Sequence, residues 1–416
     1  MDQFSKPEAE GSRWFIVISG LIINLCIGSI YSYSVIQVHL RKLFEDLGLR
    51  VSATEMQIPF IVFLLFFAIT MPIAGKYIEK FGPRKVAYFG AILVGLGWFS
   101  ASFASSPLDL AVLYGVIGGI GVGVAYNCPI VSVGRWFPDR RGLALGITLF
   151  GFGVSAAIIA PVFDFLAVNF GVILTFRILG VLFFILILLF ATFLSFPQEG
   201  WRPAGWTMHE EKRKVFMELR REEMIRTRQF YGLWASFMIG TLAGLMAIGI
   251  SKPAGLEVAQ NAGIGEAQIS ILLTALIVPF ALCNGIGRPL FGFITDKIGV
   301  MRTAILSFFL IFLASLSIFL NPKSIIAYTL SFAILWLNLG GWLAIAPTAT
   351  AFLFGTKDYA KNYGIVYTAY GAGAVIGNLL AGQSKDLFGA YLMVFPFVAL
   401  FAILGIFVAL TGLRTK

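Results

Sequence analysis

The chain has 416 residues, of which 58% are hydrophobic and only 12% carry a charge, and its formal net charge is +10. This composition excludes an ordinary soluble globular protein and indicates a polytopic membrane protein. The two histidines and three cysteines offer no metal cluster, no disulfide framework and little material for acid–base catalysis. We therefore expect a protein that is not an enzyme and uses no cofactor.

Twelve apolar stretches follow one another along the chain, each about 20 residues long, which is the length needed to span a bilayer core. We predict an all-α membrane protein with twelve transmembrane helices. The predicted helices span 14–38, 55–79, 86–105, 108–132, 143–167, 173–196, 231–255, 268–291, 301–320, 325–350, 363–382 and 390–412.

Polar residues inside the first six helices are candidates for a functional site. Tyr31 and Tyr33 on the first helix, and Tyr126 and Asn127 on the fourth, lie at mid-membrane depth, where each polar group must find a hydrogen bond. They could orient an anionic ligand or, as the alternative, bond to neighbouring backbone carbonyls. Arg177 lies one turn into the sixth helix, and we expect it to extend toward an interface in a structural role.

A polar segment, residues 198–229, separates the sixth helix from the seventh. We predict an N-terminal six-helix half at 1–197, a cytoplasmic linker at 198–229 and a C-terminal six-helix half at 230–416. The second part of the linker mixes both signs of charge with helix-forming residues, which is typical of a surface helix along the membrane. A tether between the halves is its simplest role, and a regulatory platform is the alternative.

Charged residues inside the C-terminal helices are rare and therefore informative. Lys252 ends the seventh helix, where it could serve an outer gate or extend to the membrane surface. Arg288 falls in the apolar eighth helix, where a guanidinium costs about 3 kcal/mol or more unless it faces a cavity and a partner. Its own helix supplies Asn284 one turn earlier, but no carboxylate. Either Asp164 or Glu257 supplies the acid from another helix, or the partner is a ligand, and a carboxylate matches the planar fork of arginine.

One motif occurs in both halves at corresponding positions. GKYIEKFGPRK begins at Gly75 after the second helix, and GFITDKIGVMR begins at Gly292 after the eighth. This duplication predicts two parallel repeats. We expect the glycines to let helices approach closely, and the carboxylates to pair with basic groups across a cytoplasmic gate. The predicted gate residues are Gly75, Glu79, Gly82, Arg84, Gly292, Asp296 and Gly299.

Most lysines and arginines lie on the same side of the predicted helices as the N-terminus. The other side carries five, namely Arg41, Lys42, Arg50, Lys323 and Lys385. Because basic residues stay on the cytoplasmic side, we predict a multi-pass protein of the plasma (inner) membrane with both termini in the cytoplasm. The positive charge then reflects topology and contact with anionic membrane lipids, and no nucleic-acid partner is expected. We also expect a monomer.

The duplicated G-x-x-x-[DE]-[KR]-x-G pattern in a protein of six plus six helices resembles the signature of the major facilitator superfamily. The stretches RWFPDRRGLALG (135–146), NGIGRPLFGFITDKIG (284–299) and KNYG (361–364) are similar to the oxalate/formate antiporter family and, more distantly, to the animal monocarboxylate transporters. The resemblance implies transport of a small carboxylate by alternating access. It aligns Tyr126 and Tyr370 with binding-site positions of the oxalate transporters, and Phe152 with a position where those proteins carry tyrosine.

Departures from these families narrow the expected substrate. The oxalate transporters place a second cation, a lysine, where this chain has Tyr370, and the monocarboxylate transporters place an aspartate where it has Asn284. One cation favours a monoanion, so we predict a secondary transporter of monocarboxylates such as lactate or pyruvate, in symport with a proton. The alternatives are a carboxylate exchanger of the oxalate/formate type and a membrane sensor that binds carboxylate without moving it. The predicted substrate-binding residues are Arg288, Asn284, Tyr126, Asn127, Tyr370, Tyr367, Tyr31, Tyr33 and Phe152.

Overall fold

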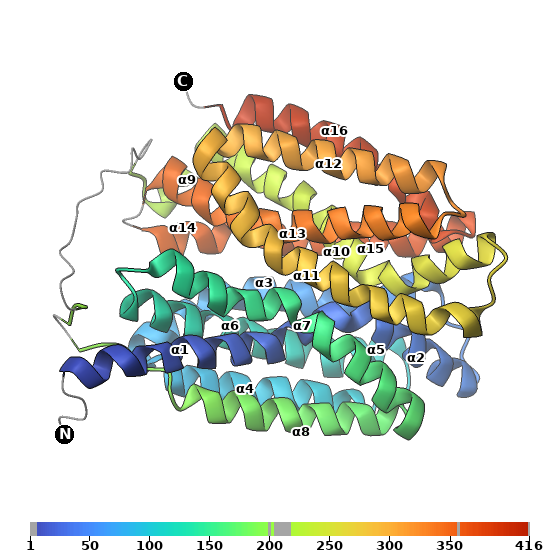
Figure 1. Cartoon of the computed structure of the whole chain (residues 1–416), viewed down its shortest axis with the longest axis horizontal. Helices are drawn as coiled ribbons and strands as arrows, with labels where there is room; N and C mark the ends of the chain where they lie inside the picture. Colours follow the sequence, from blue (N-terminus) through green and yellow to red (C-terminus); the bar gives the residue numbers. More distant parts are fainter. Residues whose placement is uncertain (1–5, 199–200, 204–217, 356–357, 415–416) are drawn as a thin grey trace.

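The computed structural model describes residues 6–198, 201–203, 218–355 and 358–414, and these residues form helices and short connections without a β-strand. Figure 1 shows two groups of helices, one from α1 to α8 and one from α10 to α16, with both chain termini at the same end. We call this end the near end and the opposite end the far end. The first group ends with α8 at Ala191, and the second begins with α10 at Arg228.

The helices of the N-terminal half begin and end as follows: α1 (Lys6–Ile27), η1 (Gly28–Ser32), α2 (Tyr33–Asp46), α3 (Ala53–Phe81), α4 (Pro83–Ala101), α5 (Pro107–Leu110), η2 (Ala111–Val116), α6 (Ile117–Trp136), α7 (Arg141–Phe170) and α8 (Val172–Ala191). Those of the linker and the C-terminal half are α9 (Arg221–Met224), α10 (Arg228–Asn261), α11 (Glu266–Ile298), α12 (Val300–Leu320), α13 (Ile325–Phe354), α14 (Tyr359–Val366), α15 (Thr368–Phe388), η3 (Tyr391–Val394) and α16 (Phe395–Gly412). Most of the predicted linker surface helix falls outside the described residues.

Eleven helical segments within the described chain are long and apolar enough to cross a membrane. The one predicted span outside this set is the third, 86–105, which corresponds to α4. This helix is only 19 residues long, and its first turn contains Arg84 and Lys85. These two charges lower the mean hydropathy of a short helix. α4 nevertheless packs lengthwise against α6 and α8, as the other spanning helices pack against their neighbours (Figure 1). The predicted all-α fold is confirmed.

Two spanning segments are interrupted near the middle of the molecule, where they contribute polar residues. The first changes from α-helix to 3₁₀-helix at Gly28, where an added Cβ would lie 2.6 Å from the carbonyl oxygen of Phe152 in α7. The close approach therefore requires glycine, and it places Tyr31 beside α7. The eleventh predicted helix is divided between α14 and α15 at Tyr367. Such local irregularities often mark functional positions in long helices.

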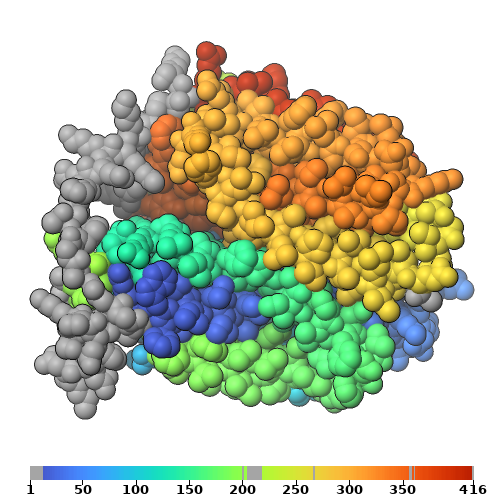
Figure 2. Space-filling view, in the orientation of Figure 1, coloured from blue at the N-terminus to red at the C-terminus, as the bar shows by residue number. Residues whose placement is uncertain are grey.

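The halves meet where α7 packs on α11 and where α3 packs on α15. At the first contact, an added Cβ on Gly153 would lie 2.9 Å from Cα of Gly285, so the two backbones touch. Toward the near end the packing differs, because a Cβ on Gly142 or Gly146 of α7 would meet no described atom within 4 Å. Figure 2 shows the molecular face indented there, between the teal surface of the N-terminal half and the orange surface of the C-terminal half.

The duplicated motif lies at the near end in both halves. Gly82 and Gly299 end α3 and α11 with φ of 82° and 83°, a backbone conformation that glycine adopts without strain. Glu79 forms an ion pair of 2.6 Å with Arg135 of α6, within its own half. Asp296 has no ion-pair partner among the described residues. The close helix approach expected at the first glycine of each copy is not made in this conformation, because a Cβ on Gly75 would meet no described atom within 4 Å and one on Gly292 only Ala344, at 4.0 Å.

Candidate functional site

Arg288 is held near the middle of the molecule by the tight packing of α11 on α13. A Cβ on Gly287 would collide with the carbonyl oxygen of Leu337, and one on Gly340 with that of Asn284, so only glycine permits this approach. Arg288 is 8% exposed, and its Nη1 donates a hydrogen bond of 2.9 Å to the carbonyl oxygen of Leu149 on α7. The arginine thus belongs to one half and is bonded to the other.

Two other nitrogen atoms of the Arg288 guanidinium make no hydrogen bond of normal geometry with the described residues. Its Nε and Nη2 atoms are buried and have no hydrogen-bond partner among the described residues. These two nitrogens form one edge of the guanidinium, the edge that accepts a carboxylate through two parallel hydrogen bonds. Burying such donors without a partner is costly, so an anion in this position would relieve a penalty that the empty site carries.

Neither acidic residue considered as a structural partner contacts Arg288. Asp164 bonds to His39 and Lys252 at the far end. Glu257 bonds to Lys385 and to the backbone N–H groups of the segment that begins at Tyr391. In the part of the chain that the structure describes, Arg288 therefore has no carboxylate partner.

Aromatic side chains from both halves surround this arginine. The ring of Phe152 lies 5.8 Å from Cζ of Arg288 and makes edge contacts with Tyr31 at 5.0 Å and Tyr126 at 5.3 Å between ring centroids. The hydroxyl of Tyr126 lies beside the guanidinium. Tyr31 and Tyr370 share a hydrogen bond of 2.9 Å between their hydroxyls, which links α15 to the N-terminal half.

Tyr367 also belongs to this aromatic group, because its ring stacks on that of Tyr370 with the centroids 5.1 Å apart. Five of the predicted residues are therefore grouped with Arg288, namely Tyr31, Tyr126, Phe152, Tyr367 and Tyr370. Tyr370 bonds to a tyrosine rather than to a charged group. No second lysine or arginine contacts these rings among the described residues.

Phe67 of α3 occupies the centre of the group, although the sequence gives no sign of it. Its ring centroid lies 5.3 Å from that of Tyr126, 5.9 Å from Phe152, and 5.8 Å from both Tyr367 and Tyr370. In the apolar run VFLLFFAIT it has the same surroundings as its phenylalanine neighbours. Only the packing of α3 on α15 distinguishes it.

Three predicted site residues bond to the backbone instead. Tyr33 donates to the carbonyl oxygen of Met56, and Asn127 donates to that of Met71 at 3.0 Å. Asn284 donates to the carbonyl oxygen of Trp336 at 3.2 Å, and its Oδ1 faces Gly153 across the α7–α11 contact. For Tyr33 and Asn127 the structure shows the backbone bonding that the sequence left as the alternative, whereas no such alternative was stated for Asn284.

The other two intramembrane cations have different surroundings. Arg177 donates from Nε to the hydroxyl of Ser102 at 3.1 Å, within its own half, as a structural residue would. Lys252 is 1% exposed and is bonded to Asp164, so it does not extend to the membrane surface. Arg288 is thus the cation whose donors remain available.

Comparison with known proteins gives consistent matches along the whole chain. The model of the Major Facilitator Superfamily matches residues 14–254 and 237–415. The oxalate:formate antiporter of Oxalobacter formigenes is 31% identical over 386 residues, which cover 91% of this chain and 86% of that protein. Monocarboxylate transporter 14 of Mus musculus is 24% identical over 479 residues, covering 96% and 90% respectively.

A solved structure of the same architecture is that of a bacterial homolog of the human lysosomal transporter Spinster, in an inward-facing and unoccupied conformation. It aligns with a TM-score of 0.71 and 16% identity over 99% of this chain and 100% of that chain. At this identity the likeness concerns the fold alone.

Proposed function

Because the chain belongs to the Major Facilitator Superfamily and is a multi-pass membrane transporter, we propose that it carries small monocarboxylates of the lactate and pyruvate class by alternating access. The observation that carries this proposal is the free Nε–Nη2 edge of the buried Arg288. A carboxylate would accept two hydrogen bonds from this edge, and the surrounding rings would enclose its short apolar end.

Charge favours a monoanion over a dianion. One carboxylate neutralises Arg288, whereas a second one would find no cation among the described residues that contact the aromatic group. A proton that travels with the monoanion makes the cycle electrically neutral, so we propose proton symport. The predicted location is the plasma (inner) membrane with both termini in the cytoplasm.

Alternating access is supported by the asymmetry between the two ends. Polar bonds cross between the halves at the far end, including those that the N–H groups of Ala53 and Thr54 donate to the carboxylate of Asp386 on α15, at 2.7 and 2.9 Å. At the near end the glycines of α7 face open space. The arrangement fits a carrier whose halves are bonded together at the far end, beneath a cavity that opens to that side, and are less tightly packed at the near end.

Exchange of the oxalate/formate type is the second candidate, favoured by the 31% identity to an oxalate:formate antiporter. Uptake into proteoliposomes separates the two. We expect labelled lactate or pyruvate to accumulate when the outside is acidic, without any internal carboxylate, because a symporter needs only the proton gradient. Uptake that requires a preloaded internal carboxylate and ignores the gradient would assign the protein to the exchangers instead.

Phe67 should limit the size of the substrate. Phe67→Leu removes the ring at the centre of the aromatic group, and the space left would admit a longer apolar chain. We expect inhibition of pyruvate uptake by 2-oxohexanoate to improve roughly tenfold, since two buried methylenes contribute about 1.6 kcal/mol. The matched control is Phe66→Leu on the same helix, which should leave the inhibition unchanged. Equal behaviour of both variants would contradict a role of Phe67 in size selection.

A further inference from the structure

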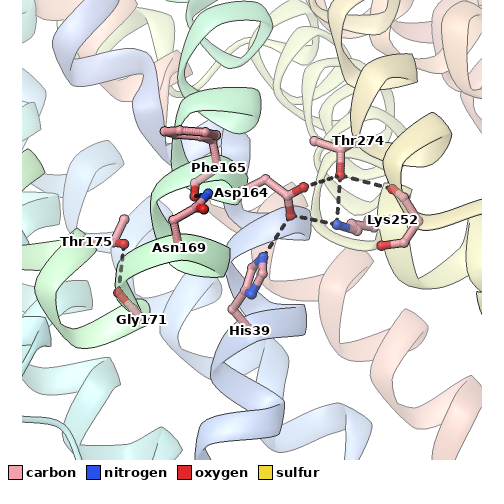
Figure 3. A network of polar contacts seen from close by, with 9 residues as sticks. His39, Asp164, Phe165, Asn169, Gly171, Thr175, Lys252 and Thr274 are labelled. Carbon is pink, nitrogen blue, oxygen red and sulfur yellow. Dashed lines mark hydrogen bonds and ion pairs between the residues drawn. The ribbon is translucent and has the colours of Figure 1, made fainter. Parts of the chain in front are cut away.

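A polar network joins the two halves at the far end (Figure 3). Oδ1 of Asp164 lies 2.8 Å from Nε2 of His39 and 2.9 Å from Nζ of Lys252. Thr274 of α11 donates to Oδ2 of Asp164 at 3.3 Å and accepts from Lys252 at 2.7 Å. His39 and Asp164 belong to the N-terminal half, whereas Lys252 and Thr274 belong to the C-terminal half. The Asp164–Lys252 ion pair therefore spans the boundary that must open.

We call the Asp164–Lys252 ion pair the latch, because its burial opposes separation of the two halves. The side chain of Lys252 is 1% exposed, and Asp164 is its ion-pair partner among the residues described. Separating the halves here leaves a buried ammonium without its counter-charge, which opposes opening. The side chain of His39 is 19% exposed and lines an open cavity of about 1250 Å³ at the far end. Protons from the solution on that side can therefore reach the histidine.

We infer that His39 is a proton-binding site that releases this latch, so that acid on the far side favours the conformation open at that end. The inference rests on the alternating access of the proposed function, but not on the identity of the substrate. Histidine is the side chain that ordinarily changes charge between about pH 5 and 8.

The direction of the proton effect on opening follows from which half carries each charged group. With His39 neutral, Lys252 faces the negative charge of Asp164. With His39 protonated, the negative charge of Asp164 is shared between His39 and Lys252. These two cations then lie within 2.9 Å of the same oxygen atom and repel each other. His39 and Asp164 stay together when the far end opens, whereas Lys252 withdraws. Protonation is thus less costly in the open state, and by linkage protons favour that state.

Other ionisable groups surround the far-end cavity and need to be distinguished from His39. Arg41, Lys42, Glu45 and Asp46 lie on α2, Glu257 on α10, and Lys385 and Asp386 on α15. Glu257 bonds within the C-terminal half, so its charge does not hold the halves together. Carboxylates, lysine and arginine ordinarily titrate outside the range from about pH 5.5 to 7.5. The variant His39→Gln therefore separates the contribution of the histidine from that of these groups.

The test measures opening directly, without any substrate. Spin labels at Asn169→Cys of α7 and Gln260→Cys of α10, both exposed at the far end, report the distance between the halves in lipid nanodiscs by double electron–electron resonance. A Cys283→Ala background removes the accessible native thiol, because Cys26 and Cys128 are buried. Lowering the pH from about 7.5 to about 5.5 should raise the long-distance population roughly threefold.

His39→Gln keeps an N–H donor for Asp164 but no titratable charge, so its distance distribution should be the same at both pH values. Lys252→Gln should be open in a larger fraction at both pH values, without an acid response. As the control, Asp386→Asn weakens the separate contact with Ala53 and Thr54 and should increase opening while keeping the roughly threefold acid response.

An acid response that persists in His39→Gln, or that is missing in the unmodified histidine background, would overturn the inference. Because no carboxylate is present, this result is independent of the transport assay. If the protein transports no monocarboxylate, the spin-label experiment can still confirm the role of His39. If it transports lactate, the same experiment can still contradict that role.

Discussion

Replacing Arg288 by lysine should lower monocarboxylate transport at least about tenfold, because the ammonium keeps the charge but loses the two-donor edge. A hydrogen bond to a charged group contributes about 1.5–3 kcal/mol, and 1.4 kcal/mol corresponds to a factor of ten. Lysine also loses the third donor, the one bonded to Leu149, which fixes the guanidinium against α7. The measurement is initial uptake of labelled lactate and pyruvate into proteoliposomes with matched protein incorporation.

Arg177→Lys is the matched control for this substitution. It also replaces an intramembrane arginine by lysine, but Arg177 bonds to Ser102 within one half, away from the aromatic group. We expect its transport to stay within about twofold of the wild type, since Arg177 lies outside the proposed carboxylate site. If Arg288→Lys transports as well as Arg177→Lys, Arg288 is not the group that binds the carboxylate.

The wild-type protein should discriminate against dianions, and Tyr370→Lys should reverse this preference. Oxalate brings two negative charges to a site with one cation, and an uncompensated charge in a buried site costs several kcal/mol. We therefore expect unlabelled oxalate to compete with labelled lactate at least about a hundredfold less well than unlabelled lactate does. In Tyr370→Lys, lactate transport should fall because an ammonium stays unpaired, and oxalate should become a competitor.

Tyr370→Phe separates the two effects of this change. It removes the hydroxyl bonded to Tyr31 and keeps the ring that stacks on Tyr367, without adding a charge. If oxalate competes in the lysine variant and not in the phenylalanine variant, the new charge is responsible. Wild-type protein that accepts oxalate as readily as lactate would contradict the monocarboxylate proposal and favour oxalate/formate exchange.

The sequence was sufficient for the fold because its strongest signals are local or repeated. Apolar length locates the spanning helices without any knowledge of their packing, and α4 was found in this way although its first turn is charged. Arg288 could be singled out for a similar reason, because an arginine inside an apolar helix needs an explanation whatever its neighbours are. These inferences required no long-range contacts.

The details of the site depend on contacts between helices that are far apart in sequence. Tyr31 and Tyr33 look equivalent in the sequence, but one contacts Tyr370 across the halves while the other bonds to the carbonyl of Met56. In the 3₁₀ segment that carries Tyr31, two residues correspond to about 240° of rotation, so the two side chains point to different faces. Choosing between them would have required the orientation of the helix around its axis.

Of the far-end network, the sequence indicates Lys252 as a possible outer-gate residue, but it does not indicate the partners of Lys252, for the same reason. His39 and Lys252 are more than two hundred residues apart, and nothing near either of them in the sequence indicates the other. Asp164 was considered only as a possible partner of Arg288, because the order of helices around the bundle cannot be read from hydropathy. Its actual partners follow from the packing of α7 against α2 and α11, which carry His39 and Thr274, and from the position of Lys252 on the neighbouring α10.

The empty space beside Gly75 and Gly292 has a consequence for protein engineering. A glycine inside a helix is about 0.5–1 kcal/mol less stable than alanine, and here neither position has a close neighbour that would forbid a methyl group. A search for thermostable variants would therefore select alanine at both positions. If the near ends of the two halves close against these glycines during transport, the same variants would transport slowly. A thermostability assay selects for the conformation described here, whereas transport also requires the conformation that is closed at the near end.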